Sequence, residues 1–292
     1  MKYNYNLRNL LPYINWAYFY HAWKVQEGSA AAQSLKDDAL QMLKSLAYRY
    51  EAYGIVEMFN AYSENDDIVL THHSTCPCPA CQAQPSIIVR LPMLRQQTPN
   101  EDGYCLCLSD YIIPKGYVQR PLSNVAHPSS TVGIFAASVS EEMQSLYADD
   151  EYKHMLVQTL SDRLAEAAAE RLHEHVRKTI WGYAANENLS EDDLKHELFD
   201  GIRPAVGYPC LPDISLNFML DRLIDFSQIG VHLTEHGMMN PHASVSGLMI
   251  AHPQARYFSI GRITEEQLSE YAKRRGMEVN DVKKYLQNNI GR

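Results

Sequence analysis

The sequence predicts an α+β fold, because helices and strands are mixed without the regular alternation of a parallel βαβ protein. A stripe of apolar residues at every fourth position indicates one long helix: Leu156, Leu160, Leu164, Ala168, Leu172 and Val176. Short runs typical of strands occur on both sides of this helix, at residues 55–60, 67–71, 86–91, 105–111, 131–139, 231–233, 244–251 and 257–260. The 292 residues contain no low-complexity linker or repeat, so we expect a single domain over residues 1–292.

The remaining helices are predicted from periodicity and from end signals. An aromatic helix is expected over residues 7–25, and a second helix over residues 30–53, before Gly54. The leucine-striped helix is expected over residues 141–180. A short helix should follow Ser190 and end by Gly201, and another should end near residue 226. Thr264 and Gln267 form a capping-box pattern for a C-terminal helix that ends before Gly276.

Charge and hydropathy limit the classes of partner. The formal net charge of -9 argues against non-specific binding of nucleic acid, which requires a basic face. No apolar run approaches the roughly 20 residues of a membrane helix, so we expect no membrane association. The N-terminal stretch is interrupted by polar residues and lacks a cleavage pattern, which predicts a cytoplasmic protein. Phosphate-binding glycine loops and the Gly-x-Ser-x-Gly elbow of hydrolases are absent from the sequence.

A cysteine-rich hairpin is predicted at about residues 72–86. Cys76, Cys78 and Cys81, with His73 nearby, offer four soft ligands that suit zinc. The spacing of Cys78 and Cys81 matches one half of a structural zinc site, but the usual distant second half is missing. The alternative is a reduced hairpin tip stiffened by prolines, so both interpretations stay open.

A proline-rich loop at residues 202–212 is the most informative local feature. Arg203 offers a planar guanidinium that suits a carboxylate. Gly207 allows close backbone approach and Tyr208 adds an aromatic face. The loop therefore has the parts of a binding site for a small ligand, or it is a stiff connection with Arg203 in a surface ion pair.

The long helix carries a row of polar residues beside its apolar stripe. Glu166, Glu170, His173 and Arg177 follow at spacings of four, three and four. The Glu-x-x-His spacing occurs in di-iron bundles, but no clear partner helix supplies a second pair. A solvated or ion-paired helix face is the preferred interpretation.

Several motifs together resemble the activation domain of cobalamin-dependent methionine synthase. They occur in family order over nearly the whole chain: residues 162–177, Trp181-Gly-Tyr183, Gly201-Ile-Arg-Pro-Ala-Val-Gly-Tyr-Pro209, Leu233-Thr-Glu235, Ala243-Ser-Val-Ser-Gly247, His252-Pro253 and residues 271–277. The resemblance implies a bent antiparallel sheet flanked by helices. It also implies binding of S-adenosylmethionine for the reductive methylation of cob(II)alamin.

The resemblance assigns roles to particular residues. It implies that Arg203 grips the carboxylate of S-adenosylmethionine, that the backbone of Ala205 contacts the ligand, and that Tyr208 faces the corrinoid. Further predicted contacts with S-adenosylmethionine are Asn15, Glu166, Glu197, Tyr257 and Phe258. At Asn15 the family motif has an aspartate; an amide still accepts a hydrogen bond but loses the charge attraction to a cationic ligand.

The resemblance also implies partners. Because the activation-domain motifs start at once in this sequence, we expect the cobalamin to be carried by a separate methionine synthase that lacks this domain. Electrons are expected from a donor such as flavodoxin. The alternative function is a docking or regulatory module for a corrinoid protein, without turnover of its own.

Overall fold

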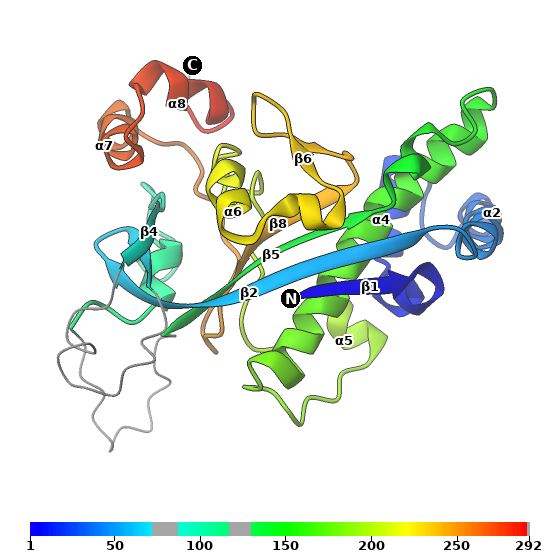
Figure 1. The fold of residues 1–292 in the computed structure, drawn as a ribbon, viewed down its shortest axis with the longest axis horizontal. Helices are drawn as coiled ribbons and strands as arrows, with labels where there is room; N and C mark the ends of the chain where they lie inside the picture. The colour runs from blue at the N-terminus through cyan, green and yellow to red at the C-terminus, as the bar shows by residue number, and fades with distance from the viewer. Residues whose placement is uncertain (72–86, 117–129, 291–292) are drawn as a thin grey trace. The chain divides into compact units, whose positions relative to one another are not determined.

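The computed structural model describes residues 1–71, 87–116 and 130–290. Figure 1 gives the element labels. The chain divides into two compact units, which are described separately. Unit 1 comprises Met1–Val56, Phe135–Phe199 and Asp221–Ser246, and unit 2 comprises Glu57–Ile134, Asp200–Leu220 and Gly247–Arg292. The expectation of a single domain over residues 1–292 stays a prediction.

One six-stranded sheet confirms the α+β class. Its strand order is β4-β3-β2-β5-β8, and β1 pairs with β2. The strands are β1 (Lys2–Asn6), β2 (Glu51–Glu64), β3 (Asp67–Thr71), β4 (Ile87–Pro92), β5 (Thr131–Val139) and β8 (Ser244–Met249). The β1–β2, β2–β3 and β3–β4 pairs are antiparallel. A separate antiparallel pair joins β6 (His232–Leu233) to β7 (Met239–Asn240).

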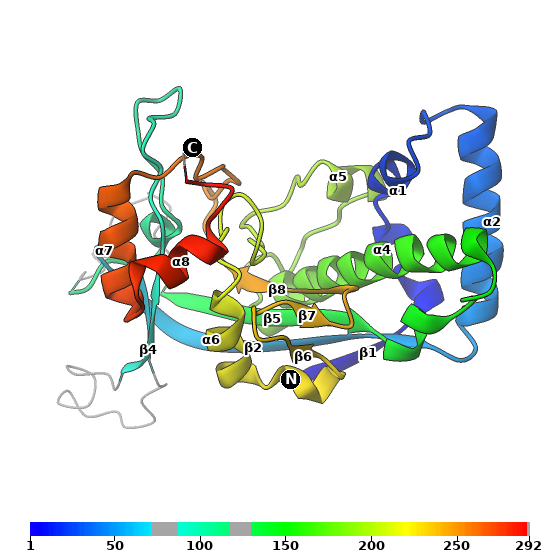
Figure 2. The same cartoon turned by 90° about the horizontal axis from the view of Figure 1, so that it is seen from above.

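Unit 1 is built around the long helix α4 (Glu151–His175), which continues into a π-turn, η4 (Val176–Ile180). α4 contacts α1 (Trp16–Ala22), α2 (Ala30–Leu46) and the 3-10 turn η1 (Leu7–Tyr13). Figure 2 shows α1 and α2 near α4. A Cβ on Gly54 of β2 would lie 3.2 Å from Leu172 of α4. Since only a hydrogen occupies this position, α4 can pack closely on β2.

Unit 2 contains the β3–β4 hairpin, α6 (Leu216–Ile224), α7 (Glu265–Arg275) and α8 (Val279–Tyr285). The division between the units falls within α6: residues 216–220 belong to unit 2 and residues 221–224 to unit 1. α7 and α8 bury an apolar cluster that includes Leu268, Tyr271 and Leu286. Thr264 caps α7 by accepting a hydrogen bond from the backbone N–H of Gln267, and Gly276 ends it with a φ of 65°.

Five sequence-predicted elements differ clearly from the structure. The helix predicted over residues 7–25 is two pieces, η1 and α1, because Asn15 caps a new helix. The helix predicted over residues 30–53 ends at Leu46, because residues from Glu51 onward pair with β1.

The helix predicted over residues 141–180 is three pieces: η3 (Glu141–Ser145), α4 and η4. Asp150 starts α4 by accepting a hydrogen bond from the N–H of Lys153. Where a strand was predicted at residues 105–111, Leu108–Tyr111 form a 3-10 turn, η2, and Cys107 makes only an isolated bridge with Arg95. Residues 257–260 are likewise not a strand, because they bond to the proline-rich loop.

Candidate functional site

The proline-rich loop of unit 2 is held at both ends by backbone hydrogen bonds. Ile202 and Ile250 exchange two bonds, of 2.9 and 3.0 Å, and the N–H of Leu248 donates to the carbonyl of Pro204 at 3.0 Å. Further along, the N–H of Ile260 donates to the carbonyl of Pro209 at 2.9 Å. The loop therefore adds to the edge of β8 and has a fixed course, as prolines and bridging bonds predict.

Arg203 belongs to this loop, and Tyr257, from a later segment of the chain, contacts it there. The hydroxyl oxygen of Tyr257 accepts a 2.9 Å hydrogen bond from the backbone N–H of Arg203. Arg203 is partly buried, and Tyr257 keeps 38% of its surface exposed. The backbone that carries the Arg203 guanidinium is thus fixed by its neighbours.

The tip of the loop exposes an aromatic ring. Gly207 has a φ of 87°, a conformation that favours glycine. Its N–H donates to the carbonyl of Leu211 at 2.8 Å, which closes the turn. Tyr208 follows with 51% of its surface exposed, so its ring is accessible to a large planar partner.

Phe258 lies beside Tyr257 in sequence but packs elsewhere. Its ring contacts the apolar cluster of α7 and α8. This packing holds the segment that carries Tyr257, while a direct contact of Phe258 with a ligand stays a prediction.

Asn15 of unit 1 caps helix α1. Its Oδ1 accepts hydrogen bonds from the N–H groups of Ala17 at 3.1 Å and Tyr18 at 3.4 Å. The amide orientation follows from this capping role. The side chain therefore uses its acceptor for the helix, and its remaining polar group is the donor Nδ2. An aspartate in the same place would retain a second, charged acceptor oxygen.

Glu166 lies on α4, on the side where α1 packs. It forms a 2.7 Å ion pair with Arg163, whose guanidinium lies 5.8 Å from the ring centre of Tyr18. The carboxylate is about one-third exposed, with 32% of its side-chain surface accessible. It therefore remains accessible to a cationic ligand although Arg163 competes for it.

Glu197 follows the short helix α5 (Glu191–Lys195), which a capping box at Ser190 and Asp193 begins. Glu197 is exposed and has a φ of 55°, which is unusual for a non-glycine residue. α5 contacts η1, and η1 contacts α4. Within unit 1, η1 therefore contacts both α4, which carries Glu166, and α5, which precedes Glu197.

The polar row predicted at residues 166–177 is ion-paired: Glu166 pairs with Arg163, and His173 and Arg177 belong to a buried cluster. Arg177 and His173 are both fully buried. Arg177 forms two hydrogen bonds with Glu187, of 2.7 and 2.9 Å, and its Nη1 donates to Nδ1 of His173 at 2.9 Å. We call Glu170, His173, Arg177, Glu187 and Phe199 the Arg177 cluster.

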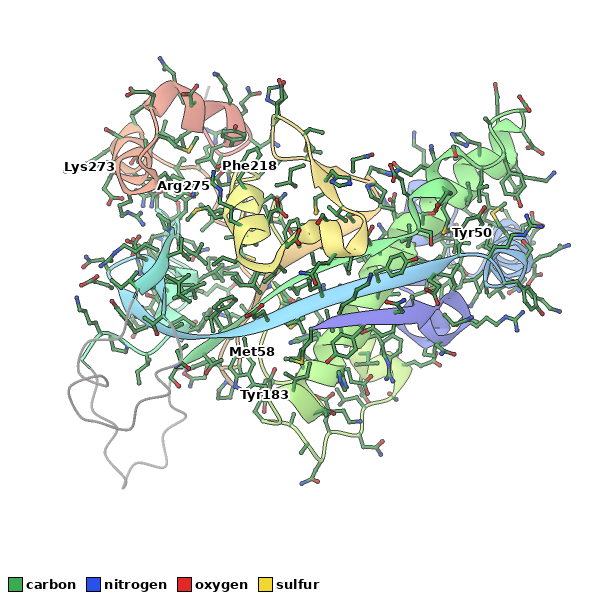
Figure 3. All side chains as sticks on the ribbon, viewed as in Figure 1. Tyr50, Met58, Tyr183, Phe218, Lys273 and Arg275 are labelled. Atoms are coloured by element: carbon green, nitrogen blue, oxygen red, sulfur yellow. The ribbon has the colours of Figure 1, made fainter. Side chains whose placement is uncertain are left out.

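A second buried polar network follows the loop in unit 2, and no sequence motif predicts it. Tyr271 of α7 donates to Asp213 at 2.7 Å, and Arg275 donates to Ser215 at 2.7 Å. Figure 3 labels Arg275 at the end of α7 and Phe218 in α6. Burial, with the carboxylate of Asp213 beside it, raises the pKa of the Tyr271 hydroxyl well above its ordinary value. These bonds fix the chain directly after the loop.

Comparison with known proteins identifies the family. The family model described as vitamin B12 dependent methionine synthase, activation domain, matches residues 6–276. The chain belongs to this family. The crystal structure of the MetH reactivation domain bound to AdoHcy is also similar, with 34% sequence identity and a TM-score of 0.87. That match covers 100% of this chain and 90% of the other chain.

The activation-domain assignment confirms the fold class and the resemblance drawn from the sequence. The loop of residues 201–209 falls within the matched range, and the alignment spans both units. Within the three described ranges, no helix is long and apolar enough to cross a membrane.

The predicted zinc site of this activation domain lies outside the described residues. Cys76, Cys78, Cys81 and His73 all fall in residues 72–86, so zinc binding stays a prediction. In the part of the chain that is described, no group of three or more histidine, cysteine or acidic residues is arranged to hold a metal ion. Among the described residues, Cys105, Cys107 and Cys210 form no disulfide. Burial raises the pKa of Cys107 to about 12, which makes its thiol unreactive.

Proposed function

We propose that this activation domain binds S-adenosylmethionine at the proline-rich loop and presents its methyl group to a corrinoid. The observation that carries the proposal is the hydrogen bond from the backbone N–H of Arg203 to the hydroxyl of Tyr257. This bond holds the tyrosine side chain against the backbone of the arginine. The similar reactivation domain binds AdoHcy, the product that S-adenosylmethionine becomes on losing its methyl group.

Arg203 is proposed to bind the ligand's carboxylate through two parallel N–H bonds. The backbone of Ala205 and the ring of Tyr257 are proposed to contact the rest of the ligand. Ala205 is bridged to Gly247 of β8, so its backbone is already in place before binding. Little acid–base chemistry is required for methyl transfer, and the contribution of the protein is positioning.

Asn15, Glu166 and Glu197 of unit 1 stay predicted contacts with the cationic part of the ligand, on the strength of the family resemblance. Glu166 and Glu197 supply negative charge, which attracts an ammonium or sulfonium group. Asn15 supplies only an amide donor once its oxygen caps α1. We therefore expect weaker binding than in a chain with aspartate at this position.

Tyr208 is proposed to face the corrinoid. Its half-exposed ring at the tip of a fixed loop suits contact with a flat macrocycle. The corrinoid supplies the cobalt nucleophile that accepts the methyl group. In this chain, the loop is proposed to orient the methyl donor, and Tyr208 to exclude water from the surface that meets the corrinoid.

The corrinoid is proposed to be carried by a methionine synthase chain that lacks its own activation domain, with flavodoxin as the electron donor. The family assignment supports a cobalamin-binding partner. Methyl transfer from S-adenosylmethionine to such a purified partner, with and without this chain, tests the proposal. Transfer that is independent of this chain would contradict it.

Calorimetry tests the binding step. S-adenosylmethionine should bind the full chain, and Arg203→Ala should weaken binding by about 2–3 kcal/mol, the cost of losing a charge-assisted pair. Arg256→Ala is the matched control, because Arg256 is an exposed arginine on the same segment as Tyr257 that pairs with Asp102. Equal loss in both variants would contradict the assignment of Arg203.

A second candidate function is a docking module that binds the corrinoid protein without turnover. It is favoured by Asn15, whose amide offers a cationic ligand no charged acceptor once its oxygen caps α1. It predicts a stable complex with the partner and no S-adenosylmethionine binding at millimolar concentration. Detectable methyl transfer would exclude it.

A further inference from the structure

Asp213 is a buried carboxylate directly after the proline-rich loop, with only 1% of its surface exposed. Its Oδ2 accepts a 2.7 Å hydrogen bond from the hydroxyl of Tyr271 and lies 3.3 Å from Nε of Arg275. Its Oδ1 accepts bonds from the backbone N–H and the hydroxyl of Ser215, at 2.9 and 2.6 Å. Arg275 also donates to the Ser215 hydroxyl, at 2.7 Å. We call Asp213, Ser215, Tyr271 and Arg275 the Asp213 lock.

The hydrogen bonds of the Asp213 lock select one arrangement of the chain. The Ser215 hydroxyl accepts from Arg275 and donates its own proton to Asp213, so its orientation is fixed. The ring of Tyr271 is part of the apolar cluster of α7 and α8. Buried polar networks that are well bonded are rigid. The lock therefore fixes residues 213–215 relative to α7, and all of these residues belong to unit 2.

Ile214 connects the lock to the turn of the proline-rich loop. Its Cγ1 would lie 3.6 Å from a Cβ added to Gly207, which is an ordinary van der Waals distance. The Ile214 side chain therefore packs against the loop at Gly207, whose N–H donates to the carbonyl of Leu211 across the turn. The lock thus supports residues 206–211, which include Tyr208.

The first residues of the loop are held by other contacts. Ile202 exchanges two backbone bonds with Ile250, and the N–H of Arg203 donates to the hydroxyl of Tyr257. Ala205 is bridged to β8. None of these contacts involves α7. The loop therefore has a base, residues 202–205, that is held by β8 and Tyr257, and a turn, residues 206–211, that is supported by the Asp213 lock.

We propose that Asp213, Tyr271 and Arg275 are positioning residues that hold the turn of the loop for methyl transfer. The inference rests on the proposed binding of S-adenosylmethionine and separates two tasks: the base binds the ligand, and the turn keeps Tyr208 in place for the transfer step. A small displacement slows a reaction in which the protein contributes positioning, even when no ligand contact is removed. Apolar residues could fill the same volume, but they would lack the directional bonds that fix the turn.

Tyr271→Phe tests the lock directly, because it removes the hydroxyl and keeps the ring in its apolar cluster. The N–H of Gly207 bonds to Leu211, and that of Leu211 bonds to Tyr208, so these two amides report on the turn. Both should exchange with deuterium about tenfold faster in the variant, while the N–H of Ile202 at the base keeps its wild-type rate. Unchanged exchange in the turn, or equal acceleration at Ile202, would overturn the proposal whether or not the ligand binds.

Two neighbouring arginines of α7 provide a matched pair. Arg275→Lys keeps the charge but loses the planar fork that reaches two members of the lock. Arg274→Lys makes the same change in an arginine that pairs with Asp67, outside the lock. Exchange in the turn should be faster in Arg275→Lys and unchanged in Arg274→Lys. Equal acceleration in both variants would overturn the specific role of the lock.

The difference between binding and transfer tests the link to function. Tyr271→Phe should leave the affinity for S-adenosylmethionine within about threefold of wild type, since Arg203 is untouched, and should slow methyl transfer to the corrinoid partner about tenfold. An unchanged transfer rate, or a loss of affinity as large as the loss of rate, would overturn the positioning role while leaving Arg203-dependent binding intact. Absence of wild-type binding would overturn the proposed function, and the link to transfer with it.

Discussion

The proline-rich loop of unit 2 and the segment of residues 187–199 of unit 1 are held by different forces. The loop is held by backbone hydrogen bonds to Ile250, Leu248 and Ile260. The segment is held by side-chain charges, chiefly those of Arg177 and Glu187. Backbone bonds tolerate changes of side chain but not of φ and ψ, whereas a buried charge cluster is sensitive to each side chain. The two regions should therefore fail under different substitutions.

The largest effect is expected from Arg177→Met. The variant leaves Glu187, 8% exposed, and Glu170, 15% exposed, buried without their cation. Removing one partner of a buried pair costs about 3–5 kcal/mol, measured by urea unfolding. The matched control is Arg171→Met on the same helix, since Arg171 is 45% exposed in its ion pair with Glu174 and should cost about 0–1 kcal/mol. Equal losses would mean that burial of Arg177 is unimportant.

A backbone change should disrupt the loop. Gly207→Ala places a side chain on a residue with φ of 87°, although the nearest atom to the new Cβ, on Ile214, is at an unstrained 3.6 Å. The expected cost is about 1–2 kcal/mol from conformation alone, with weaker ligand binding measured by calorimetry. Gly103→Ala, also at positive φ in unit 2 but outside the loop, should lose similar stability and keep ligand affinity. A loss of affinity in both would contradict a specific role for the loop.

Restoring charge in unit 1 should strengthen binding. Asn15→Asp keeps the cap of α1, since both side chains cap well, and adds a charged acceptor. The affinity for S-adenosylmethionine should rise by about 1–2 kcal/mol. Ser29→Asp, which adds the same charge at the cap of α2, is the control and should leave the affinity unchanged. A gain in both variants would indicate a general effect of negative charge.

The smallest effects concern two histidines, one in each unit. A hydrogen bond to Asp162 raises the pKa of His242, whereas burial lowers the pKa of His252. The contribution of His242 to stability is full below about pH 6.5 and is lost as pH rises through its folded pKa. That of His252 is full above about pH 6.5 and is lost as pH falls through its folded pKa. Titration by NMR should give a midpoint above pH 6.5 for His242 and below pH 6.5 for His252. Midpoints on the same side of pH 6.5 would contradict this assignment.

The helices and strands were largely predictable from the sequence, whereas the exact helix ends and the buried polar contacts between elements were not. Residues 67–71 and 131–139 are strands with the predicted bounds, because their β-branched and apolar runs are bounded by turns. Helix ends were missed where a single side chain decides them. Asn15 and Asp150 act as caps, but each is also compatible with a helix interior or a surface loop.

The site was predicted to the level of motifs. The loop around Arg203 was recognised because its prolines and glycine have fixed conformations. The Arg177 cluster was not, because its partners Glu187 and Phe199 are distant in sequence. One signal was available: Ala165, Ala167, Ala168 and Ala169 are all buried. These alanines widen the apolar face of α4 beyond the leucine stripe, which indicates that more than one side of the helix is covered.

A crystal structure of the chain soaked with S-adenosylmethionine tests the central claim most directly. The account predicts the ligand's carboxylate on the guanidinium of Arg203, its body against the backbone of Ala205 and the ring of Tyr257, and Tyr208 left accessible. Ligand density elsewhere, or a loop that stays empty at saturating ligand concentration, would contradict it.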